Sequence, residues 1–345
     1  MPTPQPVLTF LYPVTLSDEV RERLSAAAPG VETHVVPYRE DMALRNARSR
    51  GTVSAEQRAA APELSDSDWE VLERTTMALV LDLPDTMLER ARSLQWVQAI
   101  AAGTDHLDAD GLAERGVILT SGAGIAAVPI AEFVMGRLLQ VWKRFPVLDQ
   151  RQSERRWEPV SGQRVAGRTL GIVGLGAIGR ATARRARAFD MRVVGNRRRA
   201  SPGATDPDVD ELFTTDQLDE MISICDVVVI AAPAGPDTEQ LFDHKRMAAM
   251  KPGAVLCNVA RGSLVDEEAL LDALGSGQLS AAILDVTAEE PTPADSPLWS
   301  APNCYLSPHS SAVADRFEAS VVDLFLRNLG RFVRGEPLEN VVIQP

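Results

Sequence analysis

The chain has 345 residues, of which 45% are hydrophobic and 24% are charged, and its formal net charge is -13 at pH 7. Such a length holds two domains with ample core, and the composition is ordinary for a globular protein in water. The negative charge argues against a nucleic-acid partner or an anionic membrane surface, so we expect neither.

The cysteine content indicates a reducing compartment. Cys225, Cys257 and Cys304 each lie in or beside an apolar run that is typical of a strand. We expect buried, reduced thiols, a cytoplasmic location and, without a C-x-x-C pair or histidine cluster, no metal site. Met1–Pro13 has no basic start and is interrupted by prolines, which is unlike a signal peptide. No apolar run is long enough to predict a membrane span.

The first part of the chain alternates strand-like and helix-like segments. Helices are predicted over Ser17–Ala27, with Ser17 as N-cap, and over Met87–Leu94. The polar, arginine-rich stretch Arg45–Asp68 is interpreted as an insertion or mobile loop. The predicted strands are Val7–Leu11, Val31–Val36, Ala78–Leu81, Trp96–Ala101 and Val117–Thr120.

A long apolar-periodic segment, Ile125–Phe145, predicts a helix that leads into a second domain. A last amphipathic helix over Val313–Arg334 is expected to return to the first. Between them, strands are predicted at Leu170–Val173, Arg192–Gly195, Val227–Ala231, Ala254–Val259, Ala281–Asp285 and Tyr305–Ser307, and helices at Ala177–Phe189, Leu218–Ser223, Asp243–Met250 and Glu267–Gly275.

Buried strands separated by helices predict a parallel sheet that is covered on both faces. The fold class is therefore α/β, with two Rossmann-like or flavodoxin-like domains, doubly wound parallel sheets and a cleft between them. We expect a substrate domain over residues 1–121 plus 313–345, and a dinucleotide-binding domain over residues 122–312.

The segment Gly171–Arg180 contains the pattern G-x-G-x-x-G, formed by Gly174, Gly176 and Gly179. It follows a predicted strand and opens a predicted helix, which is the context that the dinucleotide fingerprint requires. The pyrophosphate would lie at the helix N-terminus, where free amides and the helix dipole favour an anion. The sequence therefore predicts a nucleotide site here.

The tip of the second strand, Asn196-Arg197-Arg198-Arg199, has no acidic residue, although an acid about 20 residues after the fingerprint normally binds the ribose hydroxyls. Arg197 stands where that acid is expected. A guanidinium attracts a 2′-phosphate, whereas a carboxylate repels one, so we expect NADP(H) to be preferred over NAD(H). The alternative is a solvated basic turn.

Three possible reactive sites follow strands of the second domain, at the edge where open α/β sheets bind ligands. Arg261 could bind a carboxylate, or it could pair with Asp266 or Glu267. In the Asp285–Pro291 segment, Glu289 and Glu290 are typical of a solvated loop unless one of them reaches a histidine. His309 is the one histidine expected at this edge, which makes it a general acid/base candidate.

Together these groups predict a hydride-transfer site for a 2-oxo acid. NADPH would supply the hydride and His309 the proton. Arg261 would fix the carboxylate and polarise the carbonyl, and Glu290 would hold His309 in one orientation.

From about Ala78 to Val342 the sequence resembles the D-isomer-specific 2-hydroxyacid dehydrogenase family. The likeness is strongest in Gly171–Arg180, Asn258–Leu270, Asp285–Trp299 and Ser307–His309. It implies that Arg261, Glu290 and His309 are the catalytic residues. It also implies substrate contacts from Ala102, Gly103, Arg261 and His309, and cofactor contacts from Pro233, Thr238, Val259, Ala260, Asp285 and Ser310. The glycine fingerprint and the strand tip predict the other cofactor contacts, namely Gly174, Gly176, Ala177, Ile178, Gly179, Asn196, Arg197 and Arg198.

The tail Asn328–Val342 is similar to that of the glyoxylate/hydroxypyruvate reductase branch, which implies a small 2-oxo or 2-hydroxy acid as substrate. The resemblance also implies a homodimer that pairs through the cofactor domains around Ile130–Trp142. Two other functions stay open: a non-catalytic, cofactor-sensing interaction protein on the same fold, and a dehydrogenase of another small anion such as phosphite.

Overall fold

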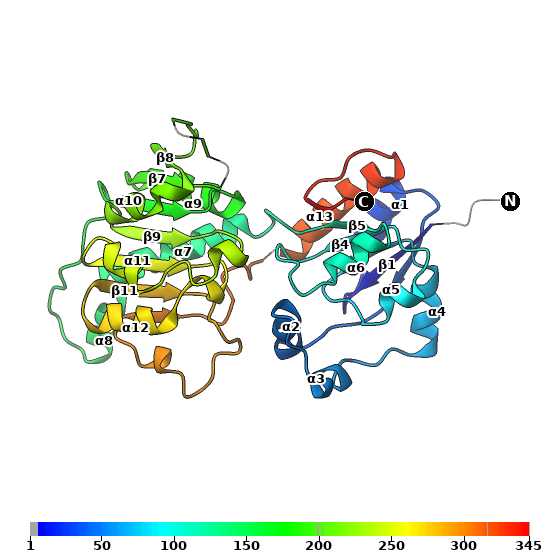
Figure 1. Cartoon of the computed structure of the whole chain (residues 1–345), viewed down its shortest axis with the longest axis horizontal. Helices are drawn as coiled ribbons and strands as arrows, with labels where there is room; N and C mark the ends of the chain where they lie inside the picture. The colour runs from blue at the N-terminus through cyan, green and yellow to red at the C-terminus, as the bar shows by residue number, and fades with distance from the viewer. Residues whose placement is uncertain (1–5, 199, 202, 316, 345) are drawn as a thin grey trace. The chain divides into compact units, whose positions relative to one another are not determined.

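A computed structural model describes residues 6–198, 200–201, 203–315 and 317–344 (Figure 1). The chain forms two compact units. Unit 1 consists of Met1–Ile125 with Asp315–Pro345, and unit 2 consists of Ala126–Ala314. Each unit is built on one largely parallel sheet, which confirms the predicted α/β class.

The sheet of unit 1 has the strand order β13-β5-β4-β3-β1-β2. Alternate residues of β3 enter two different clusters, Met77 and Leu79 on one face and Ala78 and Val80 on the other, so both faces are apolar and covered. The strands are β1 (Val7–Leu11), β2 (Glu32–Val35), β3 (Met77–Val80), β4 (Trp96–Ala99), β5 (Ile118–Thr120) and β13 (Val341–Ile343).

The prediction missed one strand of this sheet and one short helix of unit 1. Strand β13 at the chain end is an unpredicted strand, and it pairs antiparallel with β5. Helix α6 (Ala109–Glu114) was also not predicted. By contrast, α1 (Asp18–Ala27) begins at the predicted N-cap Ser17, and the last helix is α13 (Phe317–Val333). Trp96 of β4 stacks on Phe325 of α13, with 5.2 Å between ring centroids.

The interpretation of Arg45–Asp68 as a mobile loop is wrong, because most of the region is helical. The region forms α2 (Met42–Ser49), α3 (Ala55–Ala59) and α4 (Asp66–Arg74), followed by α5 (Met87–Arg90). Side chains of Asp41, Ser54 and Ser65 cap the first three helices. Such caps satisfy backbone amides that would otherwise have no partner at a helix start.

Two arginines of α2 also hold this region in place. Arg45 donates two hydrogen bonds of 2.7 Å to Asp82, which follows β3. Arg48 donates to both carboxylate oxygens of Glu40, at 2.7 and 2.8 Å. Tyr38 donates a further hydrogen bond of 2.7 Å to Glu40. Two of the arginines that made this stretch look like a surface loop, Arg45 and Arg48, therefore anchor α2 to buried carboxylates.

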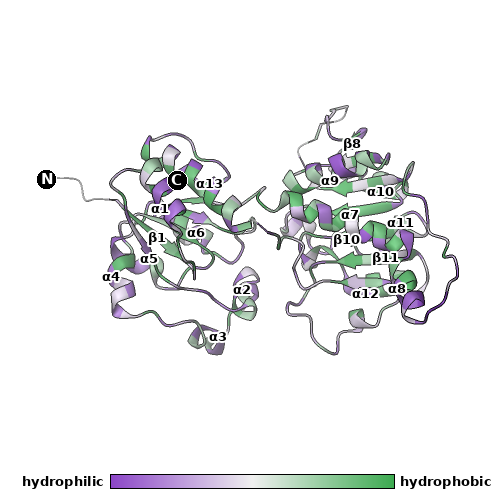
Figure 2. Ribbon diagram, turned by 180° about the vertical axis from the view of Figure 1, so that it is seen from behind, coloured by the Kyte–Doolittle hydropathy of each residue, from purple (hydrophilic) through white to green (hydrophobic). Residues whose placement is uncertain are grey.

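Unit 2 contains a parallel sheet with the order β12-β11-β10-β9-β6-β7-β8. In Figure 2 its strands are coloured as hydrophobic, as expected for strands buried on both faces. The strands are β6 (Thr169–Val173), β7 (Arg192–Asn196), β8 (Glu211–Phe213), β9 (Val227–Ile230), β10 (Ala254–Asn258), β11 (Leu279–Leu284) and β12 (Cys304–Leu306).

Helices cover both faces of this sheet. Residues of α7 (Ala127–Lys143) and α9 (Ala177–Ala188) enter one core cluster, and those of α10 (Leu218–Ser223), α11 (His244–Ala249) and α12 (Glu267–Gly275) enter the other. The predicted helix Ile125–Phe145 ends two residues early, because Arg144 adopts a left-handed conformation with φ of 56°. A separate helix, α8 (Phe145–Ser153), follows.

The three cysteines are free thiols, and Cys225 and Cys257 are buried as predicted. Cys304 is only partly buried, because its strand β12 lies at the edge of the sheet. Burial raises the pKa of Cys225 to about 12 and that of Cys304 to about 11. No helix among the described residues is long and apolar enough to cross a membrane.

Candidate active site

The three candidate catalytic residues follow three neighbouring strands of unit 2. Arg261 comes after β10, Glu290 after β11 and His309 after β12, and these strands pair in the order β12-β11-β10. All are parallel, so their carboxyl ends lie at one edge of the sheet. The fold thus gathers these groups at the edge where such sheets bind ligands.

His309 and Glu290 form a hydrogen-bonded pair. Nδ1 of His309 lies 3.0 Å from Oε2 of Glu290. A carboxylate only accepts, so Nδ1 donates and Nε2 is the ring nitrogen left for a substrate. The other carboxylate oxygen of Glu290 accepts from the backbone N–H of Thr287 at 3.2 Å. Glu290 is therefore fixed from one side while it orients the imidazole from the other.

Asp285 holds the loop that carries His309. Its buried carboxylate accepts hydrogen bonds from Ser307 Oγ at 2.7 Å and from the backbone N–H groups of Ser310 and Ser311 at 2.9 to 3.1 Å. The backbone N–H of His309 donates to the Asp285 carbonyl at 2.9 Å. His309 has a φ of 50°, which is uncommon for a residue other than glycine. These hydrogen bonds stabilise that strained conformation.

Asn258 positions the loop that carries Arg261. Its buried side chain accepts from the Ala260 N–H at 3.0 Å and donates to the Arg261 carbonyl at 2.8 Å. A Cβ atom on Gly262 would lie 1.9 Å from the Thr287 carbonyl oxygen, so this residue must be glycine. The close approach brings the loop after β10 against the loop after β11.

The two acids considered as partners of Arg261 have other contacts. Asp266 caps α12 by accepting from the N–H groups of Glu268 and Ala269. Glu267 accepts from the Ala288 N–H at 2.7 Å. The guanidinium of Arg261 donates through Nη1 to the Ala260 carbonyl at 2.8 Å.

The glycine loop joins β6 to α9 beside the point where the strand order reverses, between β6 and β9. Gly174 has a φ of 100°, and a Cβ there would lie 2.7 Å from Ala232. A Cβ on Gly176 would meet no atom within 4 Å, so the space beside it is open. Ala177 and Ile178 begin α9 there, and Gly179 lies against Gly174. This local geometry fits a pyrophosphate at the start of α9.

The tip of β7 lies beside the glycine loop, because the Asn196 carbonyl accepts from the N–H groups of Gly174 and Leu175, both at 3.1 Å. The Asn196 side chain is buried and points to the Thr214 carbonyl, at 3.4 Å. Arg197 has its Nη1 at 3.6 Å from Asp206 Oδ2, and its buried Nε has no partner among the described residues. Arg198 is exposed, and Arg199 lies outside the described residues.

The other predicted cofactor contacts follow strands at the same edge. Thr238 donates through Oγ1 to the Pro233 carbonyl at 3.0 Å, which closes the loop after β9. Val259 and Ala260 are buried after β10, and Ser310 follows His309. Open space beside Gly176 at the start of α9 is what the pyrophosphate of a dinucleotide would need, so the residues present fit such a cofactor.

The predicted substrate loop belongs to unit 1 and follows β4. Ala102 is exposed and Gly103 is partly exposed. Within the described part of the chain, neither backbone N–H of this pair has a hydrogen-bond acceptor. Such amides are available to an anion.

Some positioning residues were not predicted. Thr287, Ser307 and Ser311 orient Glu290 and Asp285, but as small hydroxyl residues in loops they carry no distinctive pattern. Asn258 had a usable signal, since it is a polar residue at the end of an otherwise apolar strand.

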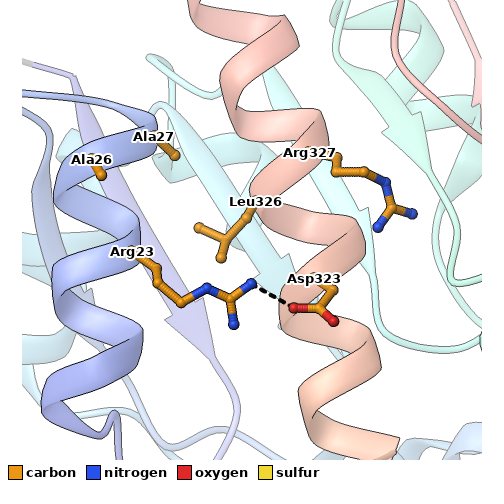
Figure 3. A pocket seen from close by; sticks show the side chains of 6 residues that line it. All are labelled: Arg23, Ala26, Ala27, Asp323, Leu326 and Arg327. Atoms are coloured by element: carbon orange, nitrogen blue, oxygen red, sulfur yellow. Dashed lines mark hydrogen bonds and ion pairs between the residues drawn. The ribbon is translucent and has the colours of Figure 1, made fainter.

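A hollow in unit 1 lies between α1 and α13 (Figure 3). It has a volume of about 640 Å³ and adjoins a second of about 440 Å³. Its wall includes the ion pair Arg23–Asp323, at 2.5 Å, and Arg327, which pairs with Glu339. Ala26, Ala27 and Leu326 complete the lining, so the hollow combines apolar side chains with charged groups that are paired.

Comparison with known proteins identifies the family. Residues 135–311 match the NAD binding domain of the D-isomer specific 2-hydroxyacid dehydrogenases. The glyoxylate reductase of Thermofilum pendens is 33% identical over 269 residues, which cover 75% of this chain and 78% of the relative. The D-3-phosphoglycerate dehydrogenase of Methanocaldococcus jannaschii is 31% identical over 75% of this chain. The match spans only about half, 49%, of the length of that relative.

Solved structures agree. A D-isomer specific 2-hydroxyacid dehydrogenase family protein from Aeromonas salmonicida superposes with a TM-score of 0.80 at 31% identity and covers 98% of this chain and 99% of its own. The NADPH-dependent glyoxylate/hydroxypyruvate reductase of Sinorhizobium meliloti, in complex with NADP and sulfate, has a TM-score of 0.74 at 27% identity and covers 98% of each chain. This chain therefore belongs to the D-isomer specific 2-hydroxyacid dehydrogenase family, in its glyoxylate/hydroxypyruvate reductase-like branch, and is an oxidoreductase of CH–OH groups that uses a nicotinamide cofactor.

Proposed function

We propose that this enzyme interconverts a small 2-oxo acid of the glyoxylate or hydroxypyruvate kind and its D-2-hydroxy acid, with His309 as the acid/base. The observation that carries the proposal is the His309–Glu290 pair, placed on strands next to the one that leads to Arg261. The names of the relatives, which include glyoxylate reductases, support the same substrate class.

In the proposed reduction, Nε2 of His309 donates its proton to the carbonyl oxygen of the substrate, and in the oxidation it takes the proton back. The bound nicotinamide supplies the hydride. Arg261 binds the substrate carboxylate, since a guanidinium can form two parallel hydrogen bonds with it. Glu290 keeps the imidazole in the tautomer and orientation that proton transfer needs.

We assign residues 122–312 to cofactor binding, and residues 1–121 with 313–345 to substrate binding. The free amides of Ala102 and Gly103 are proposed to bind the substrate carboxylate. Asp285 has a second proposed role toward the nicotinamide amide, besides fixing the His309 loop.

We further propose that NADP(H) is preferred over NAD(H). The buried Nε of Arg197 without a partner and the lack of an acid at the β7 tip support this, as does the NADP complex of the Sinorhizobium meliloti relative. The double variant Arg197→Asp with Arg198→Ala should erase or reverse the preference. A wild-type enzyme that favours NADH by about tenfold or more, or about 1.4 kcal/mol, would reject it.

A substrate panel tests the reaction. Purified protein is assayed with glyoxylate, hydroxypyruvate, larger 2-oxo acids and phosphite, each with both cofactors. We expect turnover of a small 2-oxo acid that is lost in His309→Asn. If phosphite were the only substrate turned over, the proposed class of 2-oxo acid substrates would be wrong. Cofactor binding without any turnover would instead favour the non-catalytic sensing protein.

We also propose a homodimer that pairs through unit 2. The segment expected to form the dimer contact was Ile130–Trp142. Its apolar side chains lie in the core of unit 2 itself, namely those of Ile130, Val134, Leu138 and Trp142. The support comes instead from exposed apolar side chains on α7, α8 and the loop after α8, namely Val128, Phe145, Leu148 and Trp157. Sedimentation should show a dimer that Leu148→Glu with Trp157→Glu weakens, and a wild-type monomer would reject the proposal.

A further inference from the structure

Asp206 lies between two arginines at the tip of β7. Arg180, on the first turn of α9, donates to its two carboxylate oxygens at 2.8 and 2.7 Å. Arg197 approaches the same carboxylate only through Nη1, at 3.6 Å from Oδ2. The Asp206 side chain is almost fully buried, whereas that of Arg197 is 40% exposed. The backbone N–H of Asp208 also donates to Oδ1 of Asp206, at 3.1 Å, so the buried carboxylate has two close partners and one distant arginine.

The two contacts differ in strength. The pairing with Arg180 is a two-pronged, charge-assisted interaction, which is the strongest form of such contacts. The contact with Arg197 is too long for a hydrogen bond. Hydrogen bonding with Arg180 lowers the pKa of Asp206, so the carboxylate is charged at neutral pH. Arg180 therefore occupies most of the acceptor capacity that Arg197 would otherwise use.

We propose that Asp206 and Arg180 together set how strongly Arg197 binds the 2′-phosphate of NADP. Asp206 competes with the phosphate for Arg197, and Arg180 weakens that competition by holding Asp206. Both are positioning residues that determine specificity through Arg197. The inference rests on the proposed preference for NADP(H).

The two residues predict opposite outcomes. Asp206→Asn removes the competing charge while its amide oxygen can still accept from Arg180, so phosphate binding strengthens. Arg180→Gln releases Asp206 toward Arg197, so phosphate binding weakens. Each change should be about two- to fivefold, which is the range of partly exposed ion pairs.

Calorimetry with adenosine 2′,5′-bisphosphate and with 5′-AMP tests this on the full-length protein without turnover. The bisphosphate should bind about two- to fivefold more tightly to Asp206→Asn and correspondingly more weakly to Arg180→Gln. The binding of 5′-AMP should stay unchanged in both. If Asp206 and Arg180 had only a structural role, the affinities for both ligands would change together.

Two variants with the same change of charge serve as controls. Asp210→Asn alters a carboxylate that pairs with Arg187, and Arg184→Gln alters a cation one turn further along α9. Equal effects in these variants would show a general field effect and overturn the proposal. If one test variant does not fold, the other still tests the proposal, because the direction of its change in bisphosphate affinity is predicted in advance.

The outcomes separate the two proposals. A wild-type protein that binds the bisphosphate no better than 5′-AMP overturns the NADP preference and this inference with it. In another outcome, the wild-type protein binds the bisphosphate more tightly than 5′-AMP, but Asp206→Asn and Arg180→Gln do not shift its affinity in opposite directions. That outcome overturns only the role of Asp206 and Arg180.

Discussion

Charged residues follow parallel strands in both units, but they are used differently. In unit 1, Glu40 and Asp82 have fully buried side chains, each paired with an arginine of α2. In unit 2, the His309 side chain is 40% exposed and that of Glu290 16%. The same topological position thus carries a structural network in one unit and the pair proposed for proton transfer in the other.

Burial and pairing make the difference. Burial alone would lower the pKa of Arg48, but hydrogen bonds to Glu40 and Asp85 outweigh it and raise that pKa. Burial together with the hydrogen bond to Glu40 raises the pKa of Tyr38. These groups keep one protonation state at all ordinary pH values. A network of this kind fixes α2 and cannot exchange protons with a ligand, whereas His309 keeps one ring nitrogen for it.

The largest expected effect is on catalysis. His309→Asn should lower kcat about 10²- to 10⁴-fold, the usual contribution of a general acid/base. Asparagine suits this position because it tolerates the positive φ of residue 309. The melting temperature should stay close to that of the wild type. A variant with more than a tenth of wild-type kcat would remove His309 from the proposed chemistry.

The next effect is on stability, in unit 1. Arg48→Met should cost about 3 kcal/mol, since it leaves the buried carboxylate of Glu40 without its cation. Arg58→Gln is the matched control, because Arg58 is largely exposed and pairs with Asp85 at 3.0 Å, so its loss should cost about 0 to 1 kcal/mol. Urea unfolding measures both. Equal losses would show that burial does not set the cost here.

A smaller effect is the pH dependence that comes from His106. Burial lowers the pKa of His106 below its usual 6.5, although a backbone hydrogen bond to Leu81 and the charge of Asp82 partly oppose this. Below pH 6.5 the unfolded chain gains a proton that the folded chain resists, so stability falls as the pH falls. Above pH 6.5, His106 does not contribute to the pH dependence of the free energy of unfolding. Unfolding of His106→Gln should depend less steeply on pH between about 7 and 5, and an unchanged slope would contradict the assignment.

The smallest effect is expected at the hollow between α1 and α13. The side chains of Arg23 and Asp323 are 41% and 50% exposed, so water screens their ion pair. Arg23→Gln should lower the free energy of unfolding by less than about 1 kcal/mol, and added salt should reduce the difference further. A loss as large as that of Arg48→Met would mean that exposed and buried pairs are equivalent in this protein.

Features with local signals could be predicted from the sequence. The glycine spacing after an apolar strand predicted the β6–α9 turn, and the positions of Arg261, Glu290 and His309 after strands predicted one shared sheet edge. Ser17 marked the start of α1 because a cap acts on residues close by.

Features that depend on partners distant in the sequence could not be predicted. Arg45 contacts Asp82 and Arg180 contacts Asp206, but nothing in the local pattern distinguishes these arginines from solvated ones. The hydrogen bonds of Asp285 to Ser310 and Ser311 likewise depend on the pairing of β11 with β12. Strand β13 is three residues long and follows a turn, which is too short for a periodic signal.

Strand β13 has a consequence for expression and engineering. It covers the side of β5 with Val341 opposite Thr120, and the Ser121 N–H donates to the Asn340 carbonyl at 3.0 Å. A truncation before Asn340 would leave a bare row of backbone donors and acceptors on β5, which invites strand pairing between molecules and aggregation. Residues 340–343 thus shield the side of β5 from other molecules.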